Sequence, residues 1–282
     1  MSIEADLISC GSIEMSAHLC ADAKVLGGLL PAGTKVYVNH LPRHTLADTL
    51  SALEELHGAG LEPVPHVAAR RVASRDELEA FLTRAVRSAG VQKVLLIGGD
   101  DPRPLGSFED SVALLKSGAL AACGVREVGI AGSPEGHSRI PRPALERAMV
   151  EKLSFAAAQG LGCYIVTQFS FAPARIVEYC VALARDAPGV PVYVGLAGPT
   201  DPARLLRFAQ RCGVSASLRA LRAQGMGLVR LVTHTDPGEQ LAAVAHYCAA
   251  HDDCNVVGVH LFSFGGAAKT AAWMNGVLAA RR

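Results

Sequence analysis

The sequence predicts an α/β protein with the fold of a (β/α)8 TIM barrel, in which eight parallel strands alternate with helices. Two observations predict this fold. Short apolar runs rich in β-branched residues recur eight times, and each is followed by a polar turn and a segment with helical spacing. No G-x-G-x-x-G motif follows the first run, which argues against the main alternative, a doubly wound open sheet.

The eight predicted strands share short length and apolar, β-branched character. They are Leu7–Met15, Lys35–Asn39, Glu62–Val67, Lys93–Gly98, Glu127–Ala131, Cys163–Gln168, Val190–Gly195 and Asn255–Phe262. The chain has 282 residues, half of them hydrophobic, which is enough to bury the core of one large α/β domain. No low-complexity linker interrupts it, so we expect a single domain over residues 1–282.

Several predicted helices begin at residue types that cap helix N-termini. The candidate caps are Thr45, Ser74, Ser107 and Thr200. Glu77 lies three residues after Ser74, which predicts a capping box there. Pro143 and Pro173 fit the preference of proline for the first helical turn. The longer segment 214–237 predicts an additional helix outside the regular repeat.

Charge and composition restrict the partners. The 27 basic and 26 acidic residues give a net charge of +1, and no basic run exceeds two residues. We therefore expect neither nucleic acid nor a membrane as a partner. The N-terminus lacks the pattern of a signal peptide, and no apolar run approaches the roughly 20 residues of a membrane helix.

The eight cysteines are scattered, with no C-x-x-C pair and no zinc-type spacing. We expect reduced, mostly buried thiols in a cytoplasmic protein. The apolar C-terminal stretch "AAWMNGVLAA" can serve a homo-oligomer interface, although packing against the barrel is the expected use.

Barrel geometry predicts where the site lies, because catalytic groups of this fold sit at the carboxyl ends of the strands. Polar or titratable residues follow nearly every predicted strand. They include Glu14, Asn39, His40, His66, Asp100, Asp101, Ser133, Glu135, His137, Gln168 and His260.

Each candidate also has a plainer interpretation. Glu14 would lie partly desolvated in the barrel mouth, where the pKa of a carboxyl rises toward that of a general acid, or it is a solvated strand-end residue. His66 is either a ligand contact or a hydrogen-bonded core histidine. Gln168 suits the edge of an amide-bearing heterocycle. Phe169 and Phe171 point to one side of an extended chain, and core packing explains either one alone.

The glycine pair Gly98-Gly99 either admits a ligand close to the backbone or forms a turn that needs positive φ. Asp100, with Glu135 and nearby histidines, could hold a hard metal ion. No spacing here is diagnostic of a metal, so we expect no metal site.

Five short motifs occur at predicted strand ends in one order: "SIEMS" at 12–16, "PHV" at 65–67, "GGDDP" at 98–102, "SPEGH" at 133–137 and "TQFSF" at 167–171. They resemble, in order, the F-E-F-type, P-H, R-G-D-x-P, Y-P-E-x-H and T-Q-x-F-F motifs of the methylenetetrahydrofolate reductase family. The resemblance implies a flavoprotein of one-carbon metabolism whose barrel binds FAD and a tetrahydrofolate at its carboxyl face.

The resemblance also implies residue roles. Glu14 matches the general acid that protonates folate N10, and Asp100 matches an aspartate beside the flavin that contacts the pterin. Gln168 matches the glutamine that binds the pterin, with Phe171 as a further substrate contact. The implied cofactor-binding residues are Asn39, His66, Gly98, Gly99, Ser133, Glu135 and His137.

Some positions depart from the family pattern. Gly98 replaces the arginine of R-G-D-x-P, Ser133 replaces the tyrosine of Y-P-E-x-H, and Ala172 replaces an acidic residue. The flavin-phosphate cation is displaced to Lys152, which removes charged partners of the diphosphate. Pro202 stands where the family often has an aromatic residue, so the use of NADH is left open.

We therefore expect an oxidoreductase that interconverts 5,10-methylene- and 5-methyltetrahydrofolate by flavin-mediated hydride transfer, with Glu14 as general acid and base. One alternative is a non-redox barrel that holds methylfolate for a partner methyltransferase. Another is a metal-dependent lyase or aldolase that uses Asp100, Glu135 and histidines.

Overall fold

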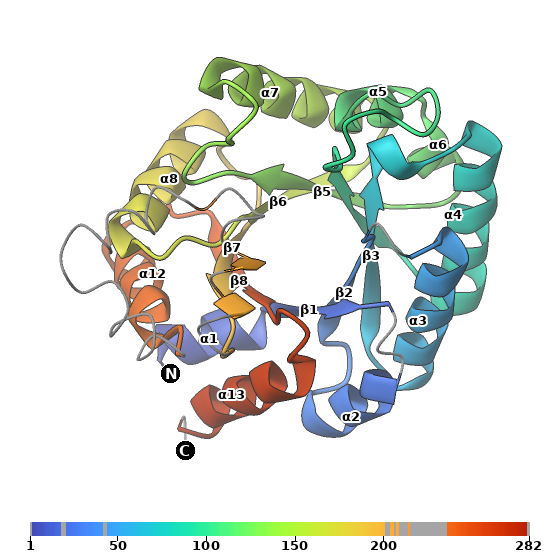
Figure 1. Ribbon diagram of the computed structural model, residues 1–282. Helices are drawn as coiled ribbons and strands as arrows, with labels where there is room; N and C mark the ends of the chain where they lie inside the picture. Colours follow the sequence, from blue (N-terminus) through green and yellow to red (C-terminus); the bar gives the residue numbers. More distant parts are fainter. Residues whose placement is uncertain are drawn as a thin grey trace. The chain divides into compact units, whose positions relative to one another are not determined.

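The computed structural model describes residues 2–17, 21–41, 44–200, 204–205, 207–208, 214 and 236–280. Within these ranges, eight parallel strands close into a barrel in chain order, so the predicted (β/α)8 TIM barrel is confirmed (Figure 1). The strands are β1 (Ser12–Ser16), β2 (Lys35–Asn39), β3 (Glu62–Ala68), β4 (Lys93–Ile97), β5 (Glu127–Gly132), β6 (Gly162–Thr167), β7 (Val192–Ala197) and β8 (Val256–Phe262).

Seven predicted strands are confirmed with ends within two residues, but the first prediction is wrong over residues 7–11. This stretch belongs to helix α1 (Ile3–Ser9) and the turn after it. The Ser2 hydroxyl accepts a hydrogen bond from the Ala5 N–H at 3.2 Å and caps the helix. Leu7 and Ile8 are buried on one side of α1, which explains why an apolar run here is helical.

The helices fill the connections between strands. They are α2 (Ala21–Leu29), α3 (Leu46–Gly58), the 3-10 turn η1 (Ala69–Arg71), α4 (Arg75–Ala89), α5 (Ser111–Lys116), α6 (Ala119–Ala122), α7 (Arg142–Ala158), α8 (Pro173–Asp186), α12 (Gly238–Ala250) and α13 (Ala267–Ala279). Pro173 is the first residue of α8 and Pro143 lies in the first turn of α7, as predicted. Thr200 is described but most of the helix predicted after it, like most of segment 214–237, lies outside the described residues.

The predicted caps of two helices are confirmed. Thr45 forms a full capping box with Asp48 at the start of α3. The Ser74 hydroxyl accepts from the Glu77 N–H at 3.1 Å, but the Glu77 carboxylate accepts from the Ala73 N–H at 2.9 Å instead of returning to Ser74.

The predicted cap at Ser107 is wrong. The carboxylate of Asp110 caps α5 by accepting from the Ala113 N–H at 2.8 Å. The segment that contains Ser107 is part of the loop after β4, so the helix starts three residues later than predicted.

The contacts divide the chain into two compact units. The first unit comprises Met1–Glu14, Gly132–Pro141 and Val166–Arg282, and the second comprises Met15–Ala131 and Arg142–Ile165. In the first unit β8 pairs with β1 and β7, and in the second β2, β3, β4 and β5 pair in sequence. The single domain over residues 1–282 stays a prediction.

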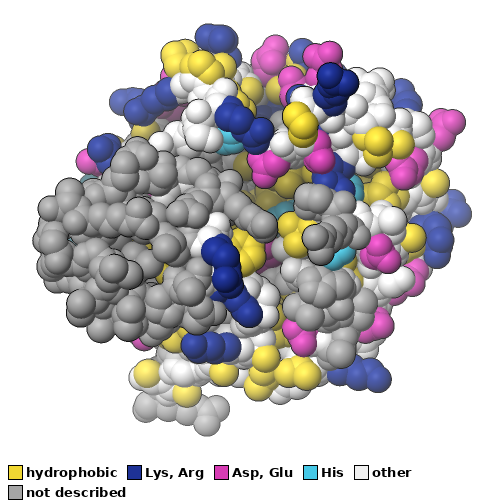
Figure 2. Space-filling model, viewed as in Figure 1, with side chains coloured by type: hydrophobic (Ala, Val, Ile, Leu, Met, Phe, Trp, Pro, Cys, Tyr) yellow, Lys and Arg dark blue, Asp and Glu magenta, His cyan; other side chains and the backbone are white. Residues whose placement is uncertain are grey.

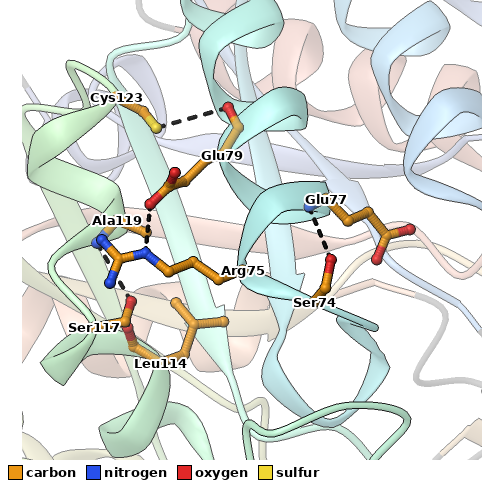
Figure 3. Close-up of polar contacts among 8 residues, drawn as sticks. All are labelled: Ser74, Arg75, Glu77, Glu79, Leu114, Ser117, Ala119 and Cys123. Carbon is orange, nitrogen blue, oxygen red and sulfur yellow. Dashed lines mark hydrogen bonds and ion pairs between the residues drawn. The ribbon is translucent and has the colours of Figure 1, made fainter.

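In the second unit, α4 is tied to the helices that follow β4 (Figure 3). Arg75 forms an ion pair with Glu79 at 2.6 Å one turn along α4. The Cys123 thiol, just after α6, donates to the Glu79 carbonyl oxygen at 3.7 Å. The Ser117 hydroxyl donates to the Leu114 carbonyl at 2.6 Å and ends α5. The Cys123 contact joins α4 to the end of α6, while the other two contacts lie within α4 and at the end of α5.

The surface charges and the cysteines can also be compared with what the sequence predicted. Figure 2 shows basic and acidic side chains interspersed over the drawn face. No described helix is long and apolar enough to cross a membrane.

None of the six described cysteines forms a disulfide. Only Cys180 among them is buried and Cys10 is exposed, so the expectation of mostly buried thiols is wrong for this part of the chain.

Arg70 holds the loop after β4. Its backbone N–H donates to the Gly98 carbonyl at 3.0 Å. Its guanidinium donates to the carbonyls of Asp101, Pro102 and Glu109 at 2.7, 2.8 and 2.9 Å. One side chain therefore replaces the backbone hydrogen bonds that a regular element would supply to this loop.

This packing predicts opposite results at two glycines of one loop. A Cβ at Gly106 would collide with the Ala73 carbonyl oxygen, whereas a Cβ at Gly98 meets nothing within 4 Å. We expect Gly106→Ala to lower the free energy of unfolding by about 2 kcal/mol or more, because backbone must move. Gly98→Ala should change it by less than about 0.5 kcal/mol. Urea unfolding of both variants measures this, and equal stabilities would contradict the close packing at Gly106.

Candidate functional site

In the first unit, the pairing of β1 with β8 brings three polar side chains together. Ser12 and His260 are register partners across the two strands. His260 Nδ1 lies 2.9 Å from Ser12 Oγ, and His260 Nε2 lies 3.8 Å from Glu14 Oε2. Ser12 and Glu14 lie two residues apart on β1, so both project from the same face of the strand. We name these residues the Glu14 cluster.

The Glu14 cluster is largely shielded from water. His260 is 0% exposed, and the Glu14 side chain is 15% exposed. The edge of the Phe262 ring and the His260 ring meet at a centroid distance of 4.7 Å and an angle of 89°. The separation of 3.8 Å is longer than a hydrogen bond, so His260 can stabilise the charged carboxylate through its own charge when its ring is protonated. His260 lies near the end of a predicted strand, but its partnership with Glu14 depends on barrel closure.

A second polar group of the first unit joins the ends of β5 and β6. The Ser170 hydroxyl donates to Glu135 Oε1 at 2.7 Å and accepts from the Ala172 N–H at 3.1 Å. The Ser133 N–H donates to the Tyr179 hydroxyl of α8 at 3.1 Å. The predicted residues Ser133 and Glu135 are thus held in place, by partners on the β6 loop and on α8 that the sequence did not reveal.

Gln168 has a fixed side-chain orientation. Its Oε1 accepts from the Phe169 N–H at 3.1 Å, and its own N–H donates to the Gly132 carbonyl at 2.8 Å. Because the side-chain oxygen is engaged by a backbone donor, the Nε2 hydrogens are the groups oriented for a ligand acceptor.

Phe171 packs in an aromatic cluster. It is 5% exposed and meets Phe169 edge-on at 5.6 Å between ring centroids. Phe169 also meets Phe264, after β8, at 5.3 Å. Phe264 has φ of 51°, a left-handed conformation that bulky residues rarely adopt. Packing is therefore a structural role of both phenylalanines of "TQFSF", and the substrate contact of Phe171 stays a prediction.

In the second unit, Asn39 is the last residue of β2 and His66 lies two residues before the end of β3. Asn39 Nδ2 donates to Ser16 Oγ at 3.4 Å. His66 is 7% exposed, and its ring meets the buried Tyr37 ring edge-on at 5.9 Å. This environment fits the plainer interpretation of His66 as a core histidine, and its contact with a flavin stays a prediction.

An ion pair crosses from η1 to the loop after β4. Arg71 Nη1 donates to both carboxylate oxygens of Asp101 at 3.2 Å. Arg71 was not selected from the sequence, and Asp101 was named only among the polar residues near strand ends. Asp101 therefore has a structural function, since it holds a cation at the carboxyl end of β3.

His40 lies in the field of this ion pair. It is 6% exposed, and burial together with the Arg71 and His44 charges lowers the pKa of its imidazole to about 4, against an opposing effect of Asp101. Its Nδ1 has no hydrogen-bond partner among the described residues. His40 is thus a neutral imidazole at pH 7, at the end of β2.

The remaining predicted residues lie in loops. Asp100 is exposed, directly after the glycine pair. Gly99 has φ of 93°, so the turn interpretation of the pair applies to it. His137 Nδ1 accepts from the Arg139 N–H at 3.2 Å. Within the described ranges, no group of three or more His, Cys, Asp or Glu side chains is placed to hold a metal ion.

Several cations around the loop after β4 are engaged within the protein or buried, whereas Arg103 in the loop itself is exposed. Arg70 and Arg71, the cations beside this loop, are engaged with backbone carbonyls and with Asp101. Lys152 is 8% exposed within α7, and burial lowers the pKa of its amine to about 8. A buried lysine does not present its charge to a phosphate.

One cavity lies away from the strand ends. It measures about 310 Å³ and is lined by residues of α5 and α7 within the second unit, including the Lys116–Glu151 ion pair at 3.5 Å. Ligand sites of (β/α)8 barrels form at strand carboxyl ends and not between outer helices, so we place no function in this groove.

Comparison with known proteins supports the fold. No protein family model matches the chain. The chain is similar to the solved structure of an uncharacterised protein from Clostridium thermocellum, with a TM-score of 0.62 at 13% identity over 95% of both chains. That protein binds two copies of 5-methyl-5,6,7,8-tetrahydrofolic acid. Yersinia pestis DHPS, solved with a pterine–sulfa conjugate, is similar with a TM-score of 0.50 at 12% identity over 97% of this chain and 94% of that one.

The low pKa of His40 predicts a pH dependence of stability. Between pH 4 and its ordinary pKa of 6.5, the unfolded chain binds a proton that the folded chain does not. The free energy of unfolding should therefore fall as pH falls through this window, by up to about 3 kcal/mol from His40. His40→Asn should flatten the dependence, and His246→Asn, at an exposed position of α12, should not. Denaturant unfolding from pH 4 to 7 measures how the free energy of unfolding depends on pH in each protein. The same pH dependence in the wild type and in His40→Asn would contradict the burial of a neutral His40.

Proposed function

We propose that this barrel binds a reduced folate and interconverts 5,10-methylene- and 5-methyltetrahydrofolate. The folate part is supported by the similar protein that binds 5-methyl-5,6,7,8-tetrahydrofolic acid and by the similar DHPS solved with a pterine–sulfa conjugate. The redox part is supported by the five ordered motifs that resemble the methylenetetrahydrofolate reductase family.

The observation that carries the catalytic proposal is the contact between Glu14 and His260. Opening the methylene bridge requires a proton at folate N10, and a carboxyl 15% exposed at a strand end is suited to deliver it. After the transfer Glu14 is a carboxylate, and a protonated His260 ring at 3.8 Å would stabilise that charge. Ser12, at 2.9 Å from the other ring nitrogen, fixes the orientation of the ring.

Gln168 is the proposed pterin-binding residue. Its amide is oriented by the Phe169 N–H, so its Nε2 hydrogens can donate to an acceptor on the pterin edge. Positioning by a fixed amide favours one orientation of the heterocycle and brings its one-carbon unit to a constant place.

A flavin, when bound, would supply the hydride that reduces the one-carbon unit to a methyl group. Arg70 and Arg71 are engaged within the protein and Lys152 is buried, so the exposed Arg103 of the β4 loop is the cation placed to meet its diphosphate. The proton chemistry of Glu14 and the pterin contact of Gln168 do not depend on which hydride carrier serves the reaction.

The engagement of Arg70 and Arg71 and the burial of Lys152 favour a second candidate, a barrel that holds methylfolate without redox chemistry. In such a barrel Gln168 would still bind the pterin, and no positively charged side chain would be needed for the phosphates of a dinucleotide. The absorption spectrum of purified protein, before and after addition of FAD and methyltetrahydrofolate, separates the two. Flavin absorbance that bleaches on mixing supports the oxidoreductase, and folate binding without any bleaching supports the second candidate.

Glu14→Gln tests the catalytic proposal. The amide keeps the shape but cannot donate a proton as a carboxyl does, so we expect turnover of methylenetetrahydrofolate to fall about 10²- to 10⁴-fold with folate binding retained. Stopped-flow kinetics and a folate titration measure these quantities. Glu55→Gln, at an exposed position of α3, is the control. Unchanged turnover in Glu14→Gln would remove Glu14 from the mechanism.

A further inference from the structure

Two thiols of the first unit lie in direct contact. Cys248 belongs to the last turn of α12, and Cys254 lies in the connection to β8. Their Sγ atoms are 3.3 Å apart, the distance of a thiol–thiol hydrogen bond. A disulfide needs about 2.05 Å between the sulfurs, so the two atoms must approach by roughly 1.2 Å. Side-chain rotation within a short connection can provide such a movement.

The backbone holds the two cysteines close. The Cys254 N–H donates to the His251 carbonyl at 3.2 Å. The His251 ring nitrogen Nδ1 lies 2.9 Å from the Tyr247 carbonyl, and the Tyr247 and His251 rings pack at 4.5 Å between centroids. The turn that separates Cys248 from Cys254 is therefore fixed at both ends, which keeps the cost in chain entropy of linking them small.

We propose that Cys248 and Cys254 form a reversible modification site, which a low-molecular-weight disulfide such as oxidised glutathione converts into an intramolecular disulfide. The inference does not depend on the proposed folate chemistry. It rests on the sulfur contact and on the partial exposure of both residues, which gives a small oxidant access.

The exchange balances in two steps. The Cys254 thiolate attacks one sulfur of oxidised glutathione, forms a mixed disulfide and releases one glutathione thiolate, which takes up a proton. Cys248 then loses its proton, attacks the Cys254 sulfur and releases the second glutathione. Two protein thiols are oxidised, one oxidant disulfide is reduced to two thiols, and excess reduced glutathione reverses both steps.

The neighbouring groups assign the order of these steps. Burial and the neighbouring Cys254 sulfur raise the pKa of the Cys248 thiol, so Cys248 stays protonated until the mixed disulfide is in place. Cys180 of α8, which packs against α12 (Figure 1), is buried, and burial raises the pKa of its thiol to about 12. A buried, protonated thiol is a poor nucleophile, so Cys180 is not the expected partner.

The link would join the end of α12 to the start of β8, the strand that carries His260 at its far end. It closes a short loop on the amino side of β8. In (β/α)8 barrels this side contributes to stability, while the carboxyl side carries the chemistry. We therefore expect oxidation to raise the midpoint of thermal unfolding by about 3 °C.

Peptide mapping tests the proposal on the whole protein. The protein is incubated with oxidised glutathione, remaining thiols are alkylated, and the chain is cleaved before Asp252, which separates the two cysteines. We expect the peptides of Cys248 and Cys254 to be recovered as one disulfide-linked pair. Addition of excess reduced glutathione should return both thiols to the alkylated form.

Two single variants and a control complete the test. Cys248→Ser and Cys254→Ser should each reduce the linked pair at least about tenfold, and Cys248→Ser should trap the mixed disulfide on Cys254. Cys123→Ser, a partly exposed cysteine of the other unit, should leave the pair unchanged. Recovery of both cysteines as alkylated thiols, as stable glutathione adducts or as links to other cysteines of the wild-type chain would overturn the proposal.

Discussion

The pairing of β8 with β1 is the constraint on which the account depends. It closes the barrel, and its register sets Ser12 opposite His260. The backbone register therefore decides a side-chain contact, since a shift of one residue would turn Glu14 and Ser12 to the other face of the strand. One closing pair links the stability of the fold to the proton chemistry proposed for Glu14, because loss of the pairing would remove the imidazole from the carboxylate.

The sequence predicted most of the fold because the signals of strand and helix are local. β2 begins and ends at the predicted residues, and Thr45 and Ser74 cap helices by contacts within four residues. The failures occurred where two local signals compete. The apolar residues of α1 resemble a strand, and Ser107 and Asp110 are both good caps, of which the structure uses Asp110 because the chain before it is held as a loop by Arg70.

The sequence allowed the candidate residues to be placed at strand ends, but not their contacts with one another. Barrel topology placed Glu14 and Gln168 at strand ends, yet the contact of Glu14 with His260 joins residues 246 positions apart and follows only from closure of the sheet. The Arg71–Asp101 ion pair likewise depends on how η1 and the β4 loop pack. A short motif alone does not establish the function of its residues. "GGDDP" resembles the family motif, yet Gly98 stands where that motif has an arginine.

Reduced-folate binding is the central claim, and equilibrium titration with 5-methyltetrahydrofolate tests it most directly. The account predicts saturable binding by the wild-type chain and a dissociation constant raised about tenfold or more in Gln168→Ala, because a hydrogen bond oriented to the pterin is lost. Gln92→Ala, at an exposed position before β4, should bind as the wild type does. Absence of saturable binding by the wild-type chain, or equal affinity in Gln168→Ala, would contradict the account.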